Sequence, residues 1–430
     1  MADNARRVLL VSYWFPPVAS VGSVRVGALA KYLPRHGWQA VVVTPRREGV
    51  RPAGVEVHET EDRDRAAAMK RRLGMRPELA LKDQLAAGAP DRGWWGAGRA
   101  AVVEVGKAFV AFPDANRGWV PFAVAAGVGV TAAGRIDAIV TSSPPVSAHL
   151  AGRELRERLG VPWIADLRDL WSQNHNSVAP AWRRALERRL ERAAFRHADA
   201  LVTVSGPLAG KLRSLHPRQR VRTILNGFDP EMTGLAHPLP ERFTICHTGT
   251  FYQGRRDPTL FLRTLSGLLS AGRMDRNRVR VCLLCRQESW LTDLVRRWGL
   301  QDVVEMRAWV PWEESLVAQQ RSQVLLLLHW GGPAEAGVYT GKIFEYLAAR
   351  RPILVVGGGE GVLVDLLRDT GAGKHVTDRE ALERVLLEWW QEYEATGIVA
   401  YPGDAGRVDR YSHERMAAEF AAVLDEVAIS

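Results

Sequence analysis

Short apolar runs that alternate with helical stretches recur along the whole chain. The clearest run spans residues 352–356, where β-branched residues and leucine follow one another without polar alternation. Such a run is typical of a strand buried on both faces of a parallel sheet. The other predicted strands are RVLLVSYW, WQAVVVTP, DAIVTSS, PWIADL, DALVTVS, VRTILNG, FTICHTG, VRVCLLC, VEMRAWV and QVLLLLHW. With helices between them, for example at 24–33, these strands predict an α/β fold of doubly wound parallel sheets.

The pattern occurs twice, and 430 residues exceed one ordinary hydrophobic core. Glycine and proline cluster at 226–243, between the last strand of the first half and the first strand of the second. We therefore predict two Rossmann-like domains, residues 1–236 and 237–410, facing each other across a cleft. An amphipathic helix at 411–430 follows, and its packing back on the N-terminal domain is one expected arrangement.

Residues 46–116 interrupt the alternation. The segment is highly charged at first and then aromatic and apolar. A segment this long between strands is typically a lid, a binding appendage or a small helical insert. The sequence leaves these three interpretations open.

The charge balance favours an acidic partner. The 58 basic and 48 acidic residues give a formal net charge of +10. Nucleotide phosphates, an anionic membrane surface or nucleic acid would suit this charge. The many arginines and alanines also fit a genome rich in G and C, and no RNA-binding motif is present, so nucleic acid is not expected as a partner.

Cysteine use and hydropathy indicate a cytoplasmic protein. The three cysteines, Cys246, Cys282 and Cys285, do not form a disulfide framework, and we interpret the Cys282–Cys285 spacing as part of a buried strand. No signal peptide precedes the first strand. The apolar run at 119–134 is shorter than the roughly 20 residues that span a bilayer, so we predict a buried helix there. Peripheral contact with the inner face of the membrane stays open.

The loop after the first strand contains Gly22 and Gly27 but no G-x-G-x-x-G motif, which disfavours a dinucleotide site. Backbone N–H groups in such a loop can approach a phosphate or a sugar. Arg25, in the first turn of the next helix, would point toward a ligand in that loop. The alternative is a solvent-exposed arginine on a packing helix.

Two further strand ends of the first half carry polar side chains, at the edge where open α/β sheets bind ligands. Aspartate accepts hydrogen bonds from sugar hydroxyls, so contact with a sugar is one interpretation. A structural pair of Arg168 with Asp169, and a His149 without any function, are the alternatives. The candidate residues are Ser142, Ser143, His149, Asp166, Arg168 and Asp169.

In the second half, a basic loop follows the strand FTICHTG. Gly249 ends the strand, and Arg255 and Arg256 follow in the loop. Guanidinium groups bind phosphate oxygens in a forked geometry, which predicts a phosphate site. A basic pair on the surface is the alternative interpretation.

A second glycine-containing loop leads into the helix that precedes residues 352–356. Gly341, Lys342 and Glu345 lie at its start, where free N–H groups and the positive end of the helix dipole favour an anion. The carboxylate of Glu345 could accept hydrogen bonds from ribose hydroxyls. The alternative is a surface ion pair between Lys342 and Glu345. No metal-ligand cluster, nucleophile elbow or kinase signature accompanies these loops.

In the order of these motifs the chain resembles the GT-B glycosyltransferases, and most closely the large retaining class of glycosyltransferase family 4. The motifs cover most of the chain outside about 46–110. They are YWFPPVASVGSVRVGALAKYL, DAIVTSSPPVSAHL, PWIADLRDLW, ILNGFDPE, HTGTFYQGRRDP and TGKIFEYLAARRPILVVGGGEG.

The resemblance implies that a nucleotide-diphosphate sugar binds mainly to the second domain. Glu345 matches the glutamate that holds the ribose, and Arg255 or Arg256 matches the phosphate-binding arginine. Where the family often has a glutamate eight positions before Glu345, this chain has Gly337, with Glu335 two residues away. A lysine that many relatives carry after the arginine loop is also missing.

The resemblance further implies retaining transfer of a sugar from a UDP- or GDP-type donor, independent of metal and of any cofactor besides the donor. The acceptor would bind in the first domain, and polysaccharide, glycolipid or natural-product biosynthesis are the expected settings. A sugar-nucleotide epimerase, a phosphorylase or a non-catalytic scaffold on the same fold are the alternatives. The predicted catalytic residues are Asp166, Arg255 and Lys342; the donor-binding residues are Gly22, Gly249, Arg255, Arg256, Gly341, Lys342 and Glu345; the acceptor-binding residues are Arg25, Ser143, His149, Arg168 and Asp169.

Overall fold

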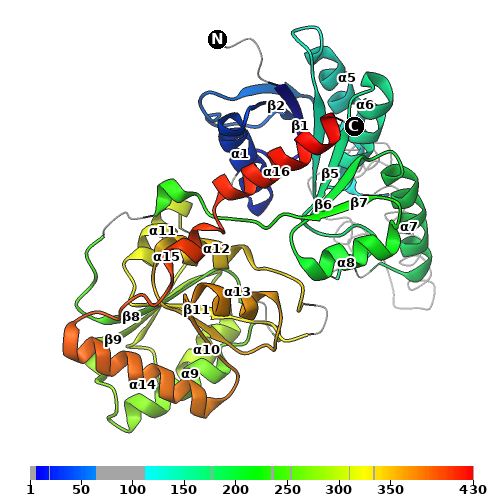
Figure 1. Cartoon of the computed structure of the whole chain (residues 1–430). Coiled ribbons are helices and arrows are strands. Elements are labelled where there is room, and N and C mark those ends of the chain that lie inside the picture. The colour runs from blue at the N-terminus through cyan, green and yellow to red at the C-terminus, as the bar shows by residue number, and fades with distance from the viewer. Residues whose placement is uncertain are drawn as a thin grey trace, which may run out of the picture. The chain divides into compact units, whose positions relative to one another are not determined.

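The chain folds into two compact units (Figure 1). Unit 1 comprises residues 1–203, 209–224 and 417–430, and unit 2 comprises 204–208 and 225–416. The computed structural model describes residues 6–18, 20–63, 112–175, 177, 179–233, 237–251, 254–308, 310–332 and 335–429. Most of the segment predicted to be an insert, 64–111, lies outside these residues, and so does the predicted domain boundary at 236.

Within the described part of unit 1, seven parallel strands form one sheet in the order β3-β2-β1-β4-β5-β6-β7. The strands are β1 (Arg6–Ser12), β2 (Trp38–Pro45), β3 (Glu56–Thr60), β4 (Ala138–Ser143), β5 (Trp163–Leu167), β6 (Ala200–Thr203) and β7 (Arg220–Thr223). The order reverses direction between β1 and β4, which pair in register from Val8 with Ala138 to Ser12 with Ser142. Ligands bind at such a switch point in open α/β sheets, beyond the carboxyl ends of the strands.

Helices cover both faces of this sheet, as a doubly wound fold requires. They are α1 (Val21–Tyr32), α5 (Val120–Val130), α6 (Ser147–Leu159), α7 (Ala181–Phe195) and α8 (Gly206–Leu215), with 3₁₀ turns at Leu33–His36 and Ala115–Trp119. Gly152 lets α6 lie close to the sheet, because a Cβ there would come within 2.5 Å of the Trp163 side chain. The apolar run predicted as a buried helix is α5, which buries one face, including Ala123 and Val124.

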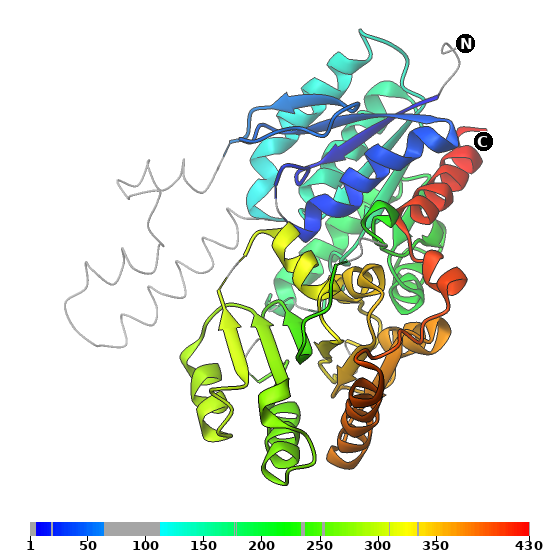
Figure 2. The same ribbon diagram turned by 90° about the vertical axis from the view of Figure 1, so that its left-hand side faces the viewer.

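The last helix, α16 (His413–Ala428), packs with its residues from 417 onward on unit 1. Asp425 accepts hydrogen bonds from Arg6 at 2.5 Å and from the Trp38 indole at 2.8 Å. The guanidinium of Arg25 in α1 lies 5.1 Å from the ring centre of Phe420, which is fully buried. Figures 1 and 2 both show α16 alongside α1. The expected packing of the C-terminal helix on the first domain is thus confirmed.

Within the described part of unit 2, six parallel strands form a sheet in the order β10-β9-β8-β11-β12-β13. They are β8 (Phe243–Thr248), β9 (Val279–Leu284), β10 (Val304–Arg307), β11 (Val324–Leu328), β12 (Ile353–Val356) and β13 (Gly373–Val376). The switch point lies between β8 and β11, which pair at Val324 with Ile245.

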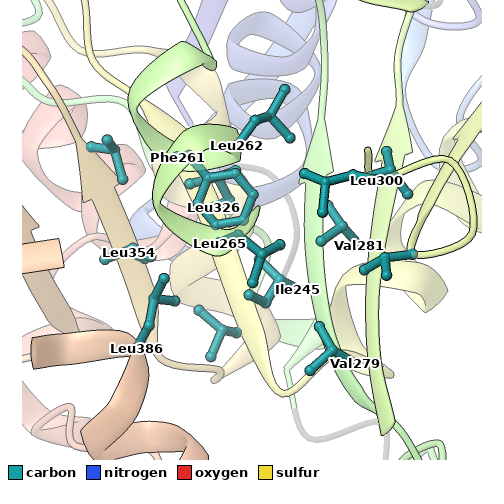
Figure 3. Close-up of a cluster of buried hydrophobic side chains, with 14 of the residues drawn as sticks. Ile245, Phe261, Leu262, Leu265, Val279, Val281, Leu300, Leu326, Leu354 and Leu386 are labelled. Atoms are coloured by element: carbon teal, nitrogen blue, oxygen red, sulfur yellow. The ribbon is translucent and has the colours of Figure 1, made fainter. Parts of the chain in front are cut away.

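The central strands of unit 2 bury both faces, as their continuous apolar runs predict. Leu326 of β11 and Leu354 of β12 face a core that also contains Phe261, whereas Leu325 and Ile353 face a second core on the other side. Figure 3 shows the first of these cores. The three cysteines are free, and Cys282 and Cys285 belong to opposite cores, as expected for residues three apart near one strand.

The helices of unit 2 divide between the two cores. Leucines of α9, α10 and α14 pack on the first, and apolar residues of α12 and α13 pack on the second. The bounds are α9 (Thr259–Ser270), α10 (Ser289–Arg297), α11 (Trp312–Gln320), α12 (Gly341–Ala349), α13 (Val362–Thr370), α14 (Arg379–Thr396) and α15 (Ala405–Asp409), with 3₁₀ turns at Pro230–Met232 and Arg276–Arg278.

From Leu225 to Met416 the chain belongs to unit 2. Phe228 is buried in the core beside α12 and pairs with the segment that leads into α16. Its N–H donates to the Tyr411 carbonyl at 3.0 Å, and its carbonyl accepts from the His413 N–H at 2.7 Å.

No helix in the described residues is long and apolar enough to cross a membrane.

Candidate functional site

The loops at the switch point of unit 2 carry the residues predicted to bind a donor. The loop after β8 begins with Gly249, and the loop after β11 leads to Gly341 and Lys342 at the start of α12. Because β8 and β11 are neighbours in the sheet, their carboxyl ends bring the two loops together. Gly249 and Gly341, which are 92 positions apart in the sequence, thereby belong to one candidate site.

The start of α12 has the features of an anion site. Its N-cap, Thr340, makes no capping hydrogen bond through its side chain. The N–H groups of a first helical turn, together with the helix dipole, attract negative charge when no side chain caps them. Gly341 and Lys342 are the first two residues of this turn.

Glu345 is held from two sides. Its Oε2 accepts a hydrogen bond from Lys342 Nζ at 3.0 Å and from Gln319 Nε2 at 3.1 Å. The side chains of Lys342 and Glu345 are 30% and 24% exposed, so a ligand can still reach both. The ion pair predicted as an alternative exists, and it places the carboxylate beside the helix N-terminus rather than in bulk water.

Gln319 is a site residue that sequence reasoning missed. It is fully buried at the end of α11 and also donates from Nε2 to Thr248 Oγ1 at 3.3 Å. The N–H of Thr248 donates to the Tyr346 hydroxyl at 3.0 Å, which in turn donates to the Leu326 carbonyl at 3.2 Å. Burial raises the pKa of Tyr346, which keeps this hydroxyl neutral. The network fixes Glu345, yet nothing in the sequence around Gln319 distinguishes it from other helical glutamines.

Gly249 allows the backbone to pass close under Lys342. Its φ of +118° lies in a region that favours glycine, and a Cβ at this position would lie 3.4 Å from Lys342 Cε. The Gly249 N–H donates to the Leu284 carbonyl of β9 at 2.9 Å, which anchors the loop to the sheet.

The two arginines of the loop after β8 differ in their surroundings. Arg255 is exposed, and its guanidinium lies 4.0 Å from the ring centre of Trp330 in the loop after β11. This stacking orients the planar group while its N–H edge stays accessible. Arg256 is half-buried, and its charge contributes to the lowered pKa values of His247 and His329.

His247 is a second residue that sequence reasoning missed, although it lies in the motif HTG. It is buried, and its Nδ1 lies 2.9 Å from the Leu326 carbonyl, which requires a proton on Nδ1. Burial lowers the pKa of His247 to about 4, so the ring is neutral at pH 7. Its ring centre lies 4.4 Å from that of Phe251, a buried residue of the loop after β8.

The loops after β11 and β12 touch through glycines. A Cβ on Gly331 would lie 2.9 Å from Gly358 Cα, and a Cβ on Gly358, which has φ of +67°, would lie 2.2 Å from the His329 ring. These contacts explain the glycines at 331 and 358. The backbone turns tightly here and leaves no room for a side chain.

In unit 1, Arg25 and Asp166 form a buried ion pair. Arg25 Nε lies 3.2 and 3.0 Å from the two carboxylate oxygens, and Nη2 lies 3.0 Å from Oδ1. Ser142 Oγ also donates to Asp166 at 2.8 Å, and Arg25 Nη2 donates to the Ile224 carbonyl at 2.9 Å. The Arg25 side chain is 2% exposed and that of Asp166 is 0% exposed. The alternative of a solvent-exposed Arg25 is therefore wrong.

The switch point of unit 1 also holds Gly22, Ser143 and Arg168. A Cβ on Gly22 would come within 3.0 Å of the Trp14 side chain, so the loop after β1 packs closely on the start of α1. Arg168 Nε donates to the Ser143 carbonyl at 2.9 Å, and burial lowers the pKa of Arg168. Among the described atoms, the buried Ser143 hydroxyl has no hydrogen-bond partner. Asp169 is half-buried beside them in the sequence.

His149 lies apart from this group, inside the unit. Its Nδ1 is 2.8 Å from Thr141 Oγ1, and its ring packs against Phe195 with centres 5.2 Å apart. Burial lowers its pKa to about 3. The structure thus brings together Arg25, Asp166 and Ser142, and separately Ser143 with Arg168, while His149 faces the aromatic core. Among the described residues, no three His, Cys, Asp or Glu side chains gather as a metal site would require.

Comparison with known proteins agrees with this architecture. Residues 22–232 match the family described as Glycosyltransferase Family 4. A search of curated proteins found no significant match. Sucrose-phosphate synthase from Thermosynechococcus elongatus superposes with a TM-score of 0.62 at 16% identity, covering 99% of this chain and 100% of that chain.

Two other solved structures are similar over nearly the same length. HepE from Anabaena, solved in complex with UDP and glucose, has a TM-score of 0.59 at 13% identity and covers 98% of this chain and 100% of its own. A glycosyltransferase from Rickettsia africae has a TM-score of 0.58 at 12% identity, with 99% of both chains covered. The two parallel sheets have the GT-B fold of these solved structures, and the family match over residues 22–232 supports a glycosyltransferase family 4-like protein.

Proposed function

We propose that this protein is a retaining glycosyltransferase that moves a sugar from a nucleotide-diphosphate donor to an acceptor hydroxyl. The observation that carries the proposal is the convergence of Gly249, Lys342 and Glu345 at the switch point of unit 2. A glycine-containing loop and a helix N-terminus without a side-chain cap can bind the phosphates of a nucleoside diphosphate. A fixed carboxylate can accept hydrogen bonds from its ribose.

In this proposal each residue binds a different part of the donor. Glu345 accepts hydrogen bonds from the ribose hydroxyls, because Lys342 and Gln319 leave its second oxygen available in the hydrogen bonds described above. Gly341 and Gly249 bring backbone N–H groups to the diphosphate. Arg255 and Arg256 supply guanidinium groups to its outer oxygens. Gly22, in unit 1, remains a proposed donor contact.

The chemistry proposed for the site is stabilisation of the leaving diphosphate. As the bond from the anomeric carbon to the phosphate oxygen breaks, negative charge develops that Lys342, the arginines and the helix N-terminus offset. The acceptor oxygen forms the new bond on the same face of the sugar, and its proton passes to the departing phosphate. These groups carry the charge without a divalent cation, and the step uses no cofactor besides the donor.

UDP is the proposed donor nucleotide, with GDP as the other choice, and HepE supports UDP because it was solved with UDP and with UDP-glucose. Ser143, His149, Arg168 and Asp169 remain proposed acceptor-side residues. For Asp166 and Arg25 we propose a positioning role, since both side chains are buried and bind each other. Their pair joins β5 to α1 and so holds the start of α1, which contains Gly22.

The test is calorimetric titration with UDP, GDP, TDP, ADP and CDP without added metal, for the intact protein and for Glu345→Ala. A charge-assisted hydrogen bond contributes about 1.5–3 kcal/mol, so the variant should bind the preferred nucleotide on the order of 10- to 100-fold more weakly. Glu383→Ala is the matched control, because Glu383 also pairs with a basic residue of its own helix, Arg379, but on α14. Equal affinity of intact protein and Glu345→Ala would refute the ribose assignment.

A second measurement separates transfer from its alternatives. An NMR spectrum of the preferred nucleotide sugar, incubated with the protein alone, should stay unchanged apart from slow hydrolysis. Conversion of the sugar to a stereoisomer would indicate an epimerase. A well-folded protein that binds none of the five nucleotides would indicate a scaffold.

A further inference from the structure

The outward face of α7 in unit 1 combines exposed apolar and cationic side chains. Trp182 is 40% exposed and Leu186 is 44% exposed. With Arg189 they are spaced i, i+4 and i+7, so they form one stripe along the helix. Arg188 and Arg192, four residues apart, form a second row beside that stripe and are also exposed. Figure 1 shows α7 at the margin of its unit.

Both carboxylates of α7 point inward instead. Glu187 is 7% exposed and accepts from Arg183 Nε at 2.9 Å. Glu191 is fully buried, accepts from the Ser172 N–H at 3.0 Å and lies 3.2 Å from His216 Nε2. The inner face of the helix therefore retains the acidic groups, and the outer face keeps only positive charge.

Within the described residues, Arg184, Arg188, Arg189 and Arg192 make no ion pair with a carboxylate. Most exposed arginines of α6 and α14 behave differently. Arg158 pairs with Glu154 at 2.5 Å, and Arg379 pairs with Glu383 at 2.6 Å. The cationic face of α7 thus lacks the intrahelical partners that similar helices of this protein have.

We propose that this face of α7 docks on a membrane surface that contains anionic lipid. A helix lies in the interface of such a membrane when arginines meet the phosphate headgroups and a tryptophan and a leucine enter between them. A duplex nucleic acid would satisfy the arginines but would leave the Trp182 and Leu186 side chains in water, which favours lipid as the occupant. The inference does not depend on the proposed sugar transfer.

The test is cosedimentation of the full-length protein with vesicles of phosphatidylcholine, with and without phosphatidylglycerol. The intact protein should bind only the vesicles with phosphatidylglycerol, and added salt should weaken binding, since exposed charges are screened over about 8 Å at physiological ionic strength. Replacing three arginines, Arg188→Gln, Arg189→Gln and Arg192→Gln together, should weaken binding on the order of 100-fold, because each basic residue near an anionic surface contributes roughly fivefold.

Two further variants test the two parts of the face. Trp182→Ala with Leu186→Ala should weaken binding while leaving the salt dependence in place. The matched control removes three exposed arginines of unit 2, Arg263→Gln, Arg273→Gln and Arg297→Gln, and should bind as the intact protein does. Thermal melts of the two arginine variants should coincide with that of the intact protein, because the replaced side chains are exposed.

Three results would overturn the proposal. The first is no binding of the intact protein to vesicles with phosphatidylglycerol. The second is an equal loss of binding in the unit 2 control, which would mean that only net charge matters. The third is binding of a DNA duplex but not of vesicles, lost in the α7 arginine variant, which would assign the face to nucleic acid.

Discussion

The buried pair of Arg25 and Asp166 makes a sharp prediction about stability. Substituting Arg25→Met removes the guanidinium and leaves a fully buried carboxylate with Ser142 as its remaining partner among the hydrogen bonds described above. Breaking a buried ion pair from one side costs about 3–5 kcal/mol, because the other charge stays in a low-dielectric site. That loss is a large share of the 5–15 kcal/mol of stability typical of a folded domain.

The double variant separates pairing from burial. Arg25→Met with Asp166→Leu removes both charges and keeps similar shapes, so it should be less destabilised than the sum of the single variants by about 2–4 kcal/mol. Urea unfolding followed by hydrogen exchange at the amides of β1 and β5 would report on the unit that holds the pair. Additive effects within about 0.5 kcal/mol, or a cost below about 1 kcal/mol for Arg25→Met, would refute the reasoning.

Three other predictions follow from single contacts. Gly249→Ala should lower nucleotide affinity at least tenfold in calorimetry. The backbone φ of +118° strains alanine by about 1–3 kcal/mol, so the loop would shift away from Lys342. Equal affinity would contradict this prediction. Gly227→Ala should lower the melting temperature by several degrees, since its Cβ would lie 2.7 Å from the Ser412 carbonyl carbon, and an unchanged temperature would show that the pairing with Ser412 can yield. Stability should fall as the pH drops from 6.5 toward 3, because burial lowers the pKa of His149 to about 3 and the unfolded chain therefore takes up this proton first. The slope from this group is at most about 1.4 kcal/mol per pH unit, and His149→Asn should reduce it in urea titrations at several pH values.

The parts of the fold that could be predicted are those whose physical cause is local. A strand buried on both faces must be apolar at every position, which is why the runs at β11 and β12 stand out in the sequence. Two of the edge strands, β3 and β13, lack this signal. β3 and β13 were missed because Glu56–Thr60 is mostly polar and Gly373–Val376 is a half-buried run of four residues that includes a glycine and a lysine.

The candidate site divides in the same way. The pairing of Lys342 with Glu345 could be predicted from the sequence, because residues at positions i and i+3 of a helix are neighbours on its surface. The contacts of Arg25 with Asp166 and of Gln319 with Glu345 could not, since they span 141 and 26 residues and depend on how strands and helices assemble. His149 illustrates the opposite case, in which a polar residue at the right sheet edge faces the core.

The packing of α16 on unit 1 has a consequence for biosynthesis. Phe420 and Asp425 complete contacts with α1, β1 and β2, yet the ribosome makes them after the whole of unit 2. A nascent chain that has emerged only to residue 416 therefore contains the strands of both sheets and the whole of unit 2 but leaves the unit 1 surface beside Arg25 uncovered. Unit 2 can therefore complete its fold before the last helix of unit 1 has been synthesised. The unit that is synthesised first is completed last.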